Sequence, residues 1–130
     1  VDRAMRTPGI DWFSEELPNR MDYEYAATQI EEKGRPDFIV AHDTPHFAPP
    51  IYDRHQEAIW PEVDIQTSKQ VRAQLTQLFD FAQPAAWFAG HHHERMSQTM
   101  HGCRFEVLGS DGMPYDKWAD TFDLGEMRRR

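Results

Sequence analysis

The chain has 130 residues, with 14 Lys+Arg against 22 Asp+Glu, which gives a formal net charge of -8. This acidic balance argues against a protein that mainly neutralises nucleic-acid phosphates, because such binding needs a basic face. No window approaches the ~20 apolar residues that cross a bilayer, and no signal-peptide pattern opens the chain. The single cysteine, Cys103, excludes an internal disulfide framework. We therefore expect a cytoplasmic protein with no membrane partner, comprising one domain or part of one.

The first regular element expected is a helix over 22–33. Asp22 can cap its N-terminus, and Gly34 is well placed to end it. Pro36 prevents any continuation, since a proline has no backbone N–H to donate. The uninterrupted apolar run 38–41 that follows predicts a strand covered on both faces.

Prolines punctuate the next segment, 43–65, in which the sequence indicates little regular structure. Loops this long in a compact domain are usually functional or disordered. An amphipathic helix follows, with Thr67 or Ser68 as its expected N-cap. Pro84 ends that helix, because a proline cannot continue the hydrogen-bonded backbone.

A second short apolar strand is expected at 85–89, directly before Gly90. Two antiparallel strands follow at 96–101 and 104–108, joined around Gly102. The alternation of helix and strand indicates an α/β fold, in which helices cover a sheet. In such sheets, ligands collect where strands end and loops begin.

Histidines follow both of the apolar strands. His42 comes directly after the first, and His91, His92 and His93 come after the second, behind Gly90. Neutral imidazole is the commonest nitrogen ligand for transition metals. In extended backbone, positions i and i+2 point to the same side, so His91 and His93 could share one pocket with His42. Gly90 would allow a tight turn before them. From the residues alone, a metal role and a structural or surface role stay equally open.

Two motifs and their order carry a resemblance to a known family. His42 with Thr44-Pro45 resembles the lone histidine that calcineurin-like metallophosphoesterases place after an apolar strand. Gly90-His91-His92-His93 resembles their later Gly-His-x-His motif, with His92 as the variable position. The opening 2–16 is similar to the segment that follows the third metal-binding motif of the family. Residues 1–125 therefore resemble the C-terminal half of this family.

The resemblance implies a fold and a domain organisation. It implies the C-terminal half of an α/β/β/α sandwich, with 1–130 as a single partial domain. The segment 43–65 would then lie at the rim of the site.

The resemblance also implies a dinuclear site that holds two divalent ions of Mn, Fe or Zn. His42 and His91 would bind the second ion, and His93 would bind the first. His92 would face substrate or solvent, and His46 would lie at the substrate entrance. The implied activity is hydrolysis of a phosphomonoester or phosphodiester by in-line attack of a metal-bound hydroxide.

The family's Asp-x-His, Gly-Asp and Gly-Asn-His motifs are absent from their expected places. The only Asp-x-His, Asp53-Arg54-His55, follows His42 and has no strand before it. We therefore expect no catalytic residue within this chain, which alone lacks the bridging carboxylate. The start at Val1 fits a piece of a longer protein. The missing N-terminal half, or a second copy of the chain, is the expected partner.

Two other hypotheses stay open. The chain could be a non-catalytic, truncated module used for binding or assembly, with its histidines holding one structural metal. Alternatively, His42, His91 and His93 could surround one ion with an open coordination position, as in a mononuclear hydrolase. The presence or absence of a bridging carboxylate separates the first hypothesis from a dinuclear phosphoesterase.

Overall fold

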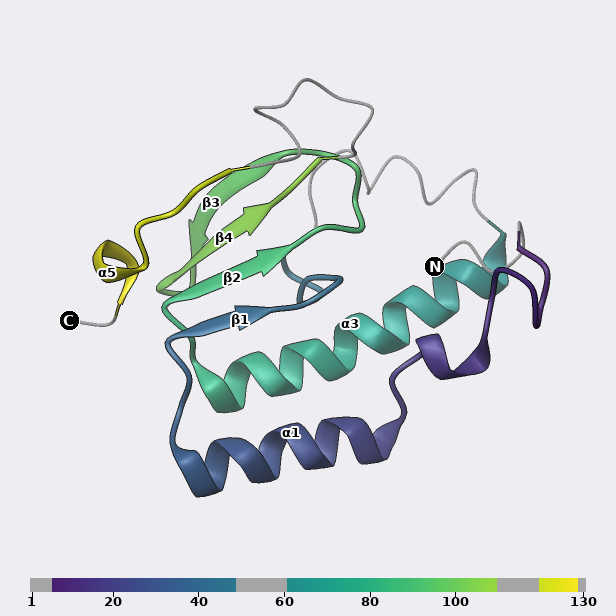
Figure 1. Cartoon of the computed structure of the whole chain (residues 1–130), viewed down its shortest axis with the longest axis horizontal. Helices are drawn as coiled ribbons and strands as arrows, with labels where there is room; N and C mark the ends of the chain where they lie inside the picture. The colour runs from purple at the N-terminus through teal and green to yellow at the C-terminus, as the bar shows by residue number, and fades with distance from the viewer. Residues whose placement is uncertain (1–5, 49–60, 110–119, 129–130) are drawn as a thin grey trace.

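The computed structural model describes residues 6–48, 61–109 and 120–128, which form helices and a mixed four-stranded sheet (Figure 1). The sheet has the order β1-β2-β4-β3, with β1, β2 and β4 parallel and β3 antiparallel to β4. The strands are β1 (Phe38–Val40), β2 (Ala86–Ala89), β3 (Met96–Met100) and β4 (Cys103–Val107). The helices are η2 (Ser14–Glu16, a 3-10 turn), α1 (Arg20–Lys33), α3 (Glu62–Ala82) and α5 (Leu124–Met127). The expected α/β class is confirmed, whereas the half-sandwich stays a prediction.

Helix α1 begins earlier than the sequence predicted. Its N-cap is Asn19, whose side chain accepts a hydrogen bond from the backbone N–H of Met21 at 2.7 Å. Asp22, the expected cap, instead accepts from the backbone N–H of Asn19 at 2.7 Å. The two side chains form a capping box, which satisfies helix-end donors reciprocally. Gly34 ends the helix as expected, with a positive φ of 90° that favours glycine.

Helix α3 also begins earlier, at Glu62 rather than at the expected caps Thr67 and Ser68. Thr67 lies inside the helix, where its hydroxyl donates to the carbonyl of Val63 at 2.7 Å. The helix ends at Gln83, which is left-handed with φ of 48°, and Pro84 follows. The expected loop is therefore shorter at its end, and 49–60 lie outside the described residues.

The first strand differs from expectation in its burial. Val40 of β1 is 83% exposed, so the strand is not covered on both faces. The reason is strand alternation, since Ile39 packs against the core and Val40, the next residue, points to the opposite face of the sheet. The hairpin of β3 and β4 is confirmed, and its turn consists of His101 and Gly102 with φ of 50° and 76°. Two left-handed residues match the twist of such two-residue hairpins.

The core lies between α3 and one face of the sheet. Leu75 and Phe79 of α3 pack against Trp87 of β2 and Phe105 of β4, all of them buried. In Figure 1, α1 and α3 pack side by side below the sheet, and Tyr23 of α1 also packs against this core. Within the described residues, none of the helices combines the length and apolar character needed to cross a membrane.

Candidate functional site

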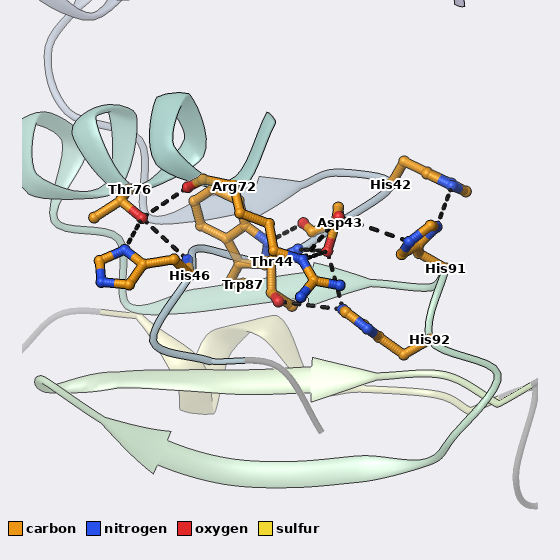
Figure 2. Close-up of polar contacts among 9 residues, drawn as sticks. All are labelled: His42, Asp43, Thr44, His46, Arg72, Thr76, Trp87, His91 and His92. Carbon is orange, nitrogen blue, oxygen red and sulfur yellow. Dashed lines mark hydrogen bonds and ion pairs between the residues drawn. The ribbon is translucent and has the colours of Figure 1, made fainter. Parts of the chain in front are cut away.

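The two histidine positions meet at one edge of the sheet. His42 follows β1 and His91 follows β2, and these strands are parallel neighbours with Val40 opposite Phe88. The pairing continues past the strands, because the backbone N–H of Gly90 donates to the carbonyl of His42 at 3.2 Å. Figure 2 shows both rings side by side at these strand ends. The predicted convergence of His42 and His91 is therefore confirmed.

A ring nitrogen of His42 faces a ring nitrogen of His91. Nδ1 of His91 lies 3.0 Å from Nε2 of His42, and the ring centroids are 4.8 Å apart. Two ligands at right angles, each about 2.1 Å from one ion, also lie about 3.0 Å apart. The separation of the two nitrogens therefore fits two cis ligands of a single metal ion, as well as a direct hydrogen bond.

The backbone after β2 is not extended, which corrects the expected arrangement of His91 and His93. Both residues are left-handed, with φ of 59° and 56°. The backbone N–H of His92 donates to the carbonyl of Gly90 at 2.6 Å, which closes a tight turn. Gly90 itself is not among the left-handed glycines, and a Cβ there would meet no atom within 4 Å. The turn thus places its strain on the histidines, and strain of about 1–3 kcal/mol per residue is typical of functional sites.

His92 points inward, whereas the family resemblance implied that it faces substrate or solvent. Its side chain is 0% exposed, and Nε2 lies 3.0 Å from Oδ1 of Asp43. The hydroxyl of Thr44 lies 3.2 Å from the same nitrogen. The expected orientation of His92 is corrected, because its imidazole is committed to a buried carboxylate.

Asp43 is the centre of this buried cluster. Its carboxylate accepts from Nε of Arg72 at 3.2 and 3.3 Å, and from the backbone N–H of Thr44 at 2.7 Å. Its carbonyl accepts from the indole N–H of Trp87 at 3.1 Å. Burial alone would raise the pKa of the Asp43 carboxyl, but the His92 hydrogen bond and the nearby positive charges hold that pKa well below its usual range. Asp43 is therefore ionised and held from four directions (Figure 2).

The environment keeps His91 neutral. Burial, with smaller contributions from neighbouring positive charge that include His92 and His42, lowers the pKa of its imidazole to about 4, although Asp43 opposes the shift. A neutral imidazole offers a lone pair to a metal, which a protonated ring does not. Near neutral pH, His91 is therefore in the form that can bind a metal.

The other predicted site residues lie apart from this pair. His93 is exposed, and no group of three or more His, Cys, Asp or Glu side chains among the described residues is arranged to hold a metal. His46 is exposed beside α3, with Nδ1 2.7 Å from the hydroxyl of Thr76 (Figure 2). Asp53-Arg54-His55 lies outside the described residues. The roles of His46 toward substrate and of His93 toward metal stay predictions.

Sequence reasoning missed the buried pair of Asp43 and Arg72. A signal for it exists, because Arg72 interrupts the apolar stripe of α3 that contains Leu75 and Phe79. A charged residue on such a stripe requires a buried partner. Asp43, two residues after the first apolar run, was a candidate for that partner.

Neither a family model nor a curated protein sequence matches the chain. The function proposed below therefore stands on the residues of the site and on the motif resemblance.

Proposed function

We propose that the chain supplies the distal metal-ligand half of a phosphoesterase site that hydrolyses a phosphomonoester or phosphodiester. The observation that carries this proposal is the 3.0 Å separation between Nε2 of His42 and Nδ1 of His91, at the carboxyl ends of adjacent parallel strands. Ligand sites in α/β sheets favour this edge. The order of the two histidine motifs in the sequence supports the same reading.

The residues present fit a metal at this position in their chemistry as well as in their spacing. His91 is neutral near pH 7, and His42 is exposed, so a ligand can approach from solvent. A divalent ion bound here would polarise a water molecule and a phosphoryl oxygen. His42 and His91 would hold this ion, and His93 would contribute to a second one.

A complete dinuclear site also needs a bridging carboxylate. Asp43 is engaged with Arg72 and His92, so it does not fill that role in this conformation. We assign the bridging group to the proposed missing half or to a second copy of the chain. Among the described residues, the outer edge of β1 has no neighbouring strand, which offers a place where a further strand can pair.

The test is metal binding with a matched pair of variants. His91 and His101 are both left-handed, with φ of 59° and 50°, and asparagine tolerates this conformation. We expect His91→Asn to weaken Mn²⁺ or Zn²⁺ binding at least 10-fold, and His101→Asn to leave it unchanged, in equilibrium titrations read by native mass spectrometry. Hydrolysis of bis-p-nitrophenyl phosphate by the natural protein that carries this chain then tests the reaction. Equal metal binding by both variants, or no binding at all, would reject the proposed site.

A non-catalytic metal-binding or assembly module is the second candidate. The observation favouring it is that the described residues hold two converging imidazoles and no three-ligand group. In that case the natural protein binds one ion through His42 and His91 but cleaves neither a phosphomonoester nor a phosphodiester.

A further inference from the structure

The two nitrogens of His91 face different partners. Nδ1 faces Nε2 of His42 at 3.0 Å, and Nε2 faces Oδ2 of Asp43 at 3.8 Å. We propose that Asp43 is a positioning residue that holds the proton of His91 on Nε2 and so leaves Nδ1 directed at His42 and at the metal. This inference rests on the function proposed above and names the group that orients its ligand.

The physical basis is the tautomer of a neutral imidazole, which carries one proton on one of its two nitrogens. At 3.8 Å the carboxylate of Asp43 is beyond hydrogen-bond length, so it acts on His91 through its charge. A buried negative charge favours the tautomer whose N–H points toward it. The lone pair then lies on Nδ1 of His91. In the metal-free protein this lone pair accepts from Nε2–H of His42, and in the metal-bound protein it would bind the ion. Carboxylates that orient metal-bound histidines in this way are common in proteins.

Asp43 can orient His91 only because its own carboxylate is fixed. Arg72 of α3 holds both carboxylate oxygens, and the backbone of Thr44 holds Oδ1. The indole of Trp87 holds the Asp43 carbonyl, which anchors the main chain directly after His42. Helix α3 and strand β2 therefore both fix the position of the charge behind His91 (Figure 2).

A purely structural explanation must also be considered, because Asp43 neutralises Arg72 and accepts from His92. Those contacts alone would make Asp43 important for folding and indifferent to the tautomer of His91. A test of the proposal must therefore measure the ring of His91 itself. Long-range ¹H–¹⁵N correlation spectra of the metal-free protein do this, since they distinguish an Nε2–H from an Nδ1–H imidazole.

We expect the wild-type spectrum to show His91 mainly as the Nε2–H tautomer, with the resonance assigned by its loss in His91→Asn. We expect Asp43→Asn, which keeps the shape and removes the charge, to reduce that preference and to weaken Mn²⁺ or Zn²⁺ binding about 10–100-fold. The matched control is Glu106→Gln, which alters a second buried carboxylate whose described partners include no histidine. It should change neither the tautomer nor the metal affinity by more than about twofold.

A predominant Nδ1–H tautomer in the wild-type protein overturns the proposal, and so does a folded Asp43→Asn variant with wild-type tautomer and affinity. If Asp43→Asn does not fold, the wild-type spectrum and the charge-preserving Asp43→Glu variant still decide, because the latter should keep the Nε2–H form. If the wild-type protein binds no metal, the proposed function fails, whereas the tautomer measurement still confirms or rejects the role of Asp43.

Discussion

Asp43 and Glu106 are buried carboxylates on opposite sides of one sheet, only 4% and 0% exposed. Asp43 lies on the α3 side, where Arg72 of that helix binds it. Glu106 alternates along β4 with the core residues Phe105 and Val107, so its side chain lies on the other face. Each face of the sheet therefore buries one carboxylate, and each buried charge is compensated by an arginine.

The two solutions differ in the chemistry of the partners. Glu106 accepts from Arg95 at 2.7 Å, from Arg104 at 2.6 Å and from the hydroxyl of Ser97 at 2.8 Å. Arg95 also pairs with Asp120 at 2.8 Å, which ties the C-terminal segment to the sheet. A guanidinium stays protonated in proteins and offers no lone pair, so these arginines cannot bind a metal ion or accept a proton.

Around Asp43, imidazoles take part as well. His92 donates to Oδ1, and His91 faces Oδ2 with its remaining nitrogen directed at His42. A neutral imidazole binds a metal through the nitrogen that carries no proton, so the position of its proton determines which nitrogen can be a ligand. Both carboxylates therefore pair with arginine, but within the described residues only Asp43 also faces imidazoles, which is why a role in orienting His91 is proposed for Asp43 and not for Glu106.

The largest expected effect is the loss of stability when either carboxylate is removed. Asp43→Ala removes the buried carboxylate that pairs with the buried guanidinium of Arg72, which should lower the free energy of unfolding by about 3–5 kcal/mol. Glu106→Ala should cost less, because Arg104 is 48% exposed and its charge is screened by solvent. Urea unfolding of both variants measures the difference. A greater loss for Glu106→Ala would show that the far-side network, rather than the Asp43 cluster, holds the sheet together.

A smaller effect is expected at the contact that holds the C-terminal segment. Phe122 lies 5.1 Å from the ring of Phe88, with the guanidinium of Arg95 6.0 Å from its centroid. Because Phe122 is only half-buried, Phe122→Ala should lower the free energy of unfolding by about 1–2 kcal/mol. Metal affinity should not change, since this contact lies on the Glu106 side. An affinity loss of tenfold in a folded Phe122→Ala variant would contradict the separation of the two networks.

The smallest expected effect is a shift in the titration of Tyr23, which reports the charge of Asp43. Burial, with smaller contributions from the charges of Asp43 and Asp22, raises the pKa of the Tyr23 phenol to about 12. The folded pKa lies above the ordinary value near 10, so the neutral phenol of Tyr23 contributes to the free energy of unfolding below about pH 10. This contribution is lost as the pH rises toward about 12. Tyr23→Phe should remove this dependence, measured by unfolding at several pH values and by phenolate absorbance.

Two further variants make the Tyr23 measurement specific. Tyr25→Phe is the matched control on the same helix, because Tyr25 is 67% exposed and should not alter the high-pH loss of stability. Asp43→Asn should lower the pKa of Tyr23, whereas Glu106→Gln should leave it in place. Equal shifts from both substitutions would mean that Tyr23 does not distinguish the two carboxylates.

Local signals in the sequence predicted much of the framework. Gly34 ends α1, Gly102 forms the β3–β4 turn, and the apolar runs before His42 and Gly90 become parallel strands. Each of these follows from residues a few positions apart, through caps, turns and apolar runs. The pairing of His42 with His91 followed from the same signals, because parallel strands end at one edge.

Sequence by itself therefore determined the α/β alternation and the histidines at the strand ends. Tertiary structure alone decided that Val40 is exposed on an edge strand and that His92 turns inward. It also paired Asp43 with Arg72, 29 residues apart, and through that pair fixed the charge behind His91. The physical reason is that burial and charge pairing depend on which distant segments pack together, whereas caps, turns and periodicity depend on neighbours in the chain.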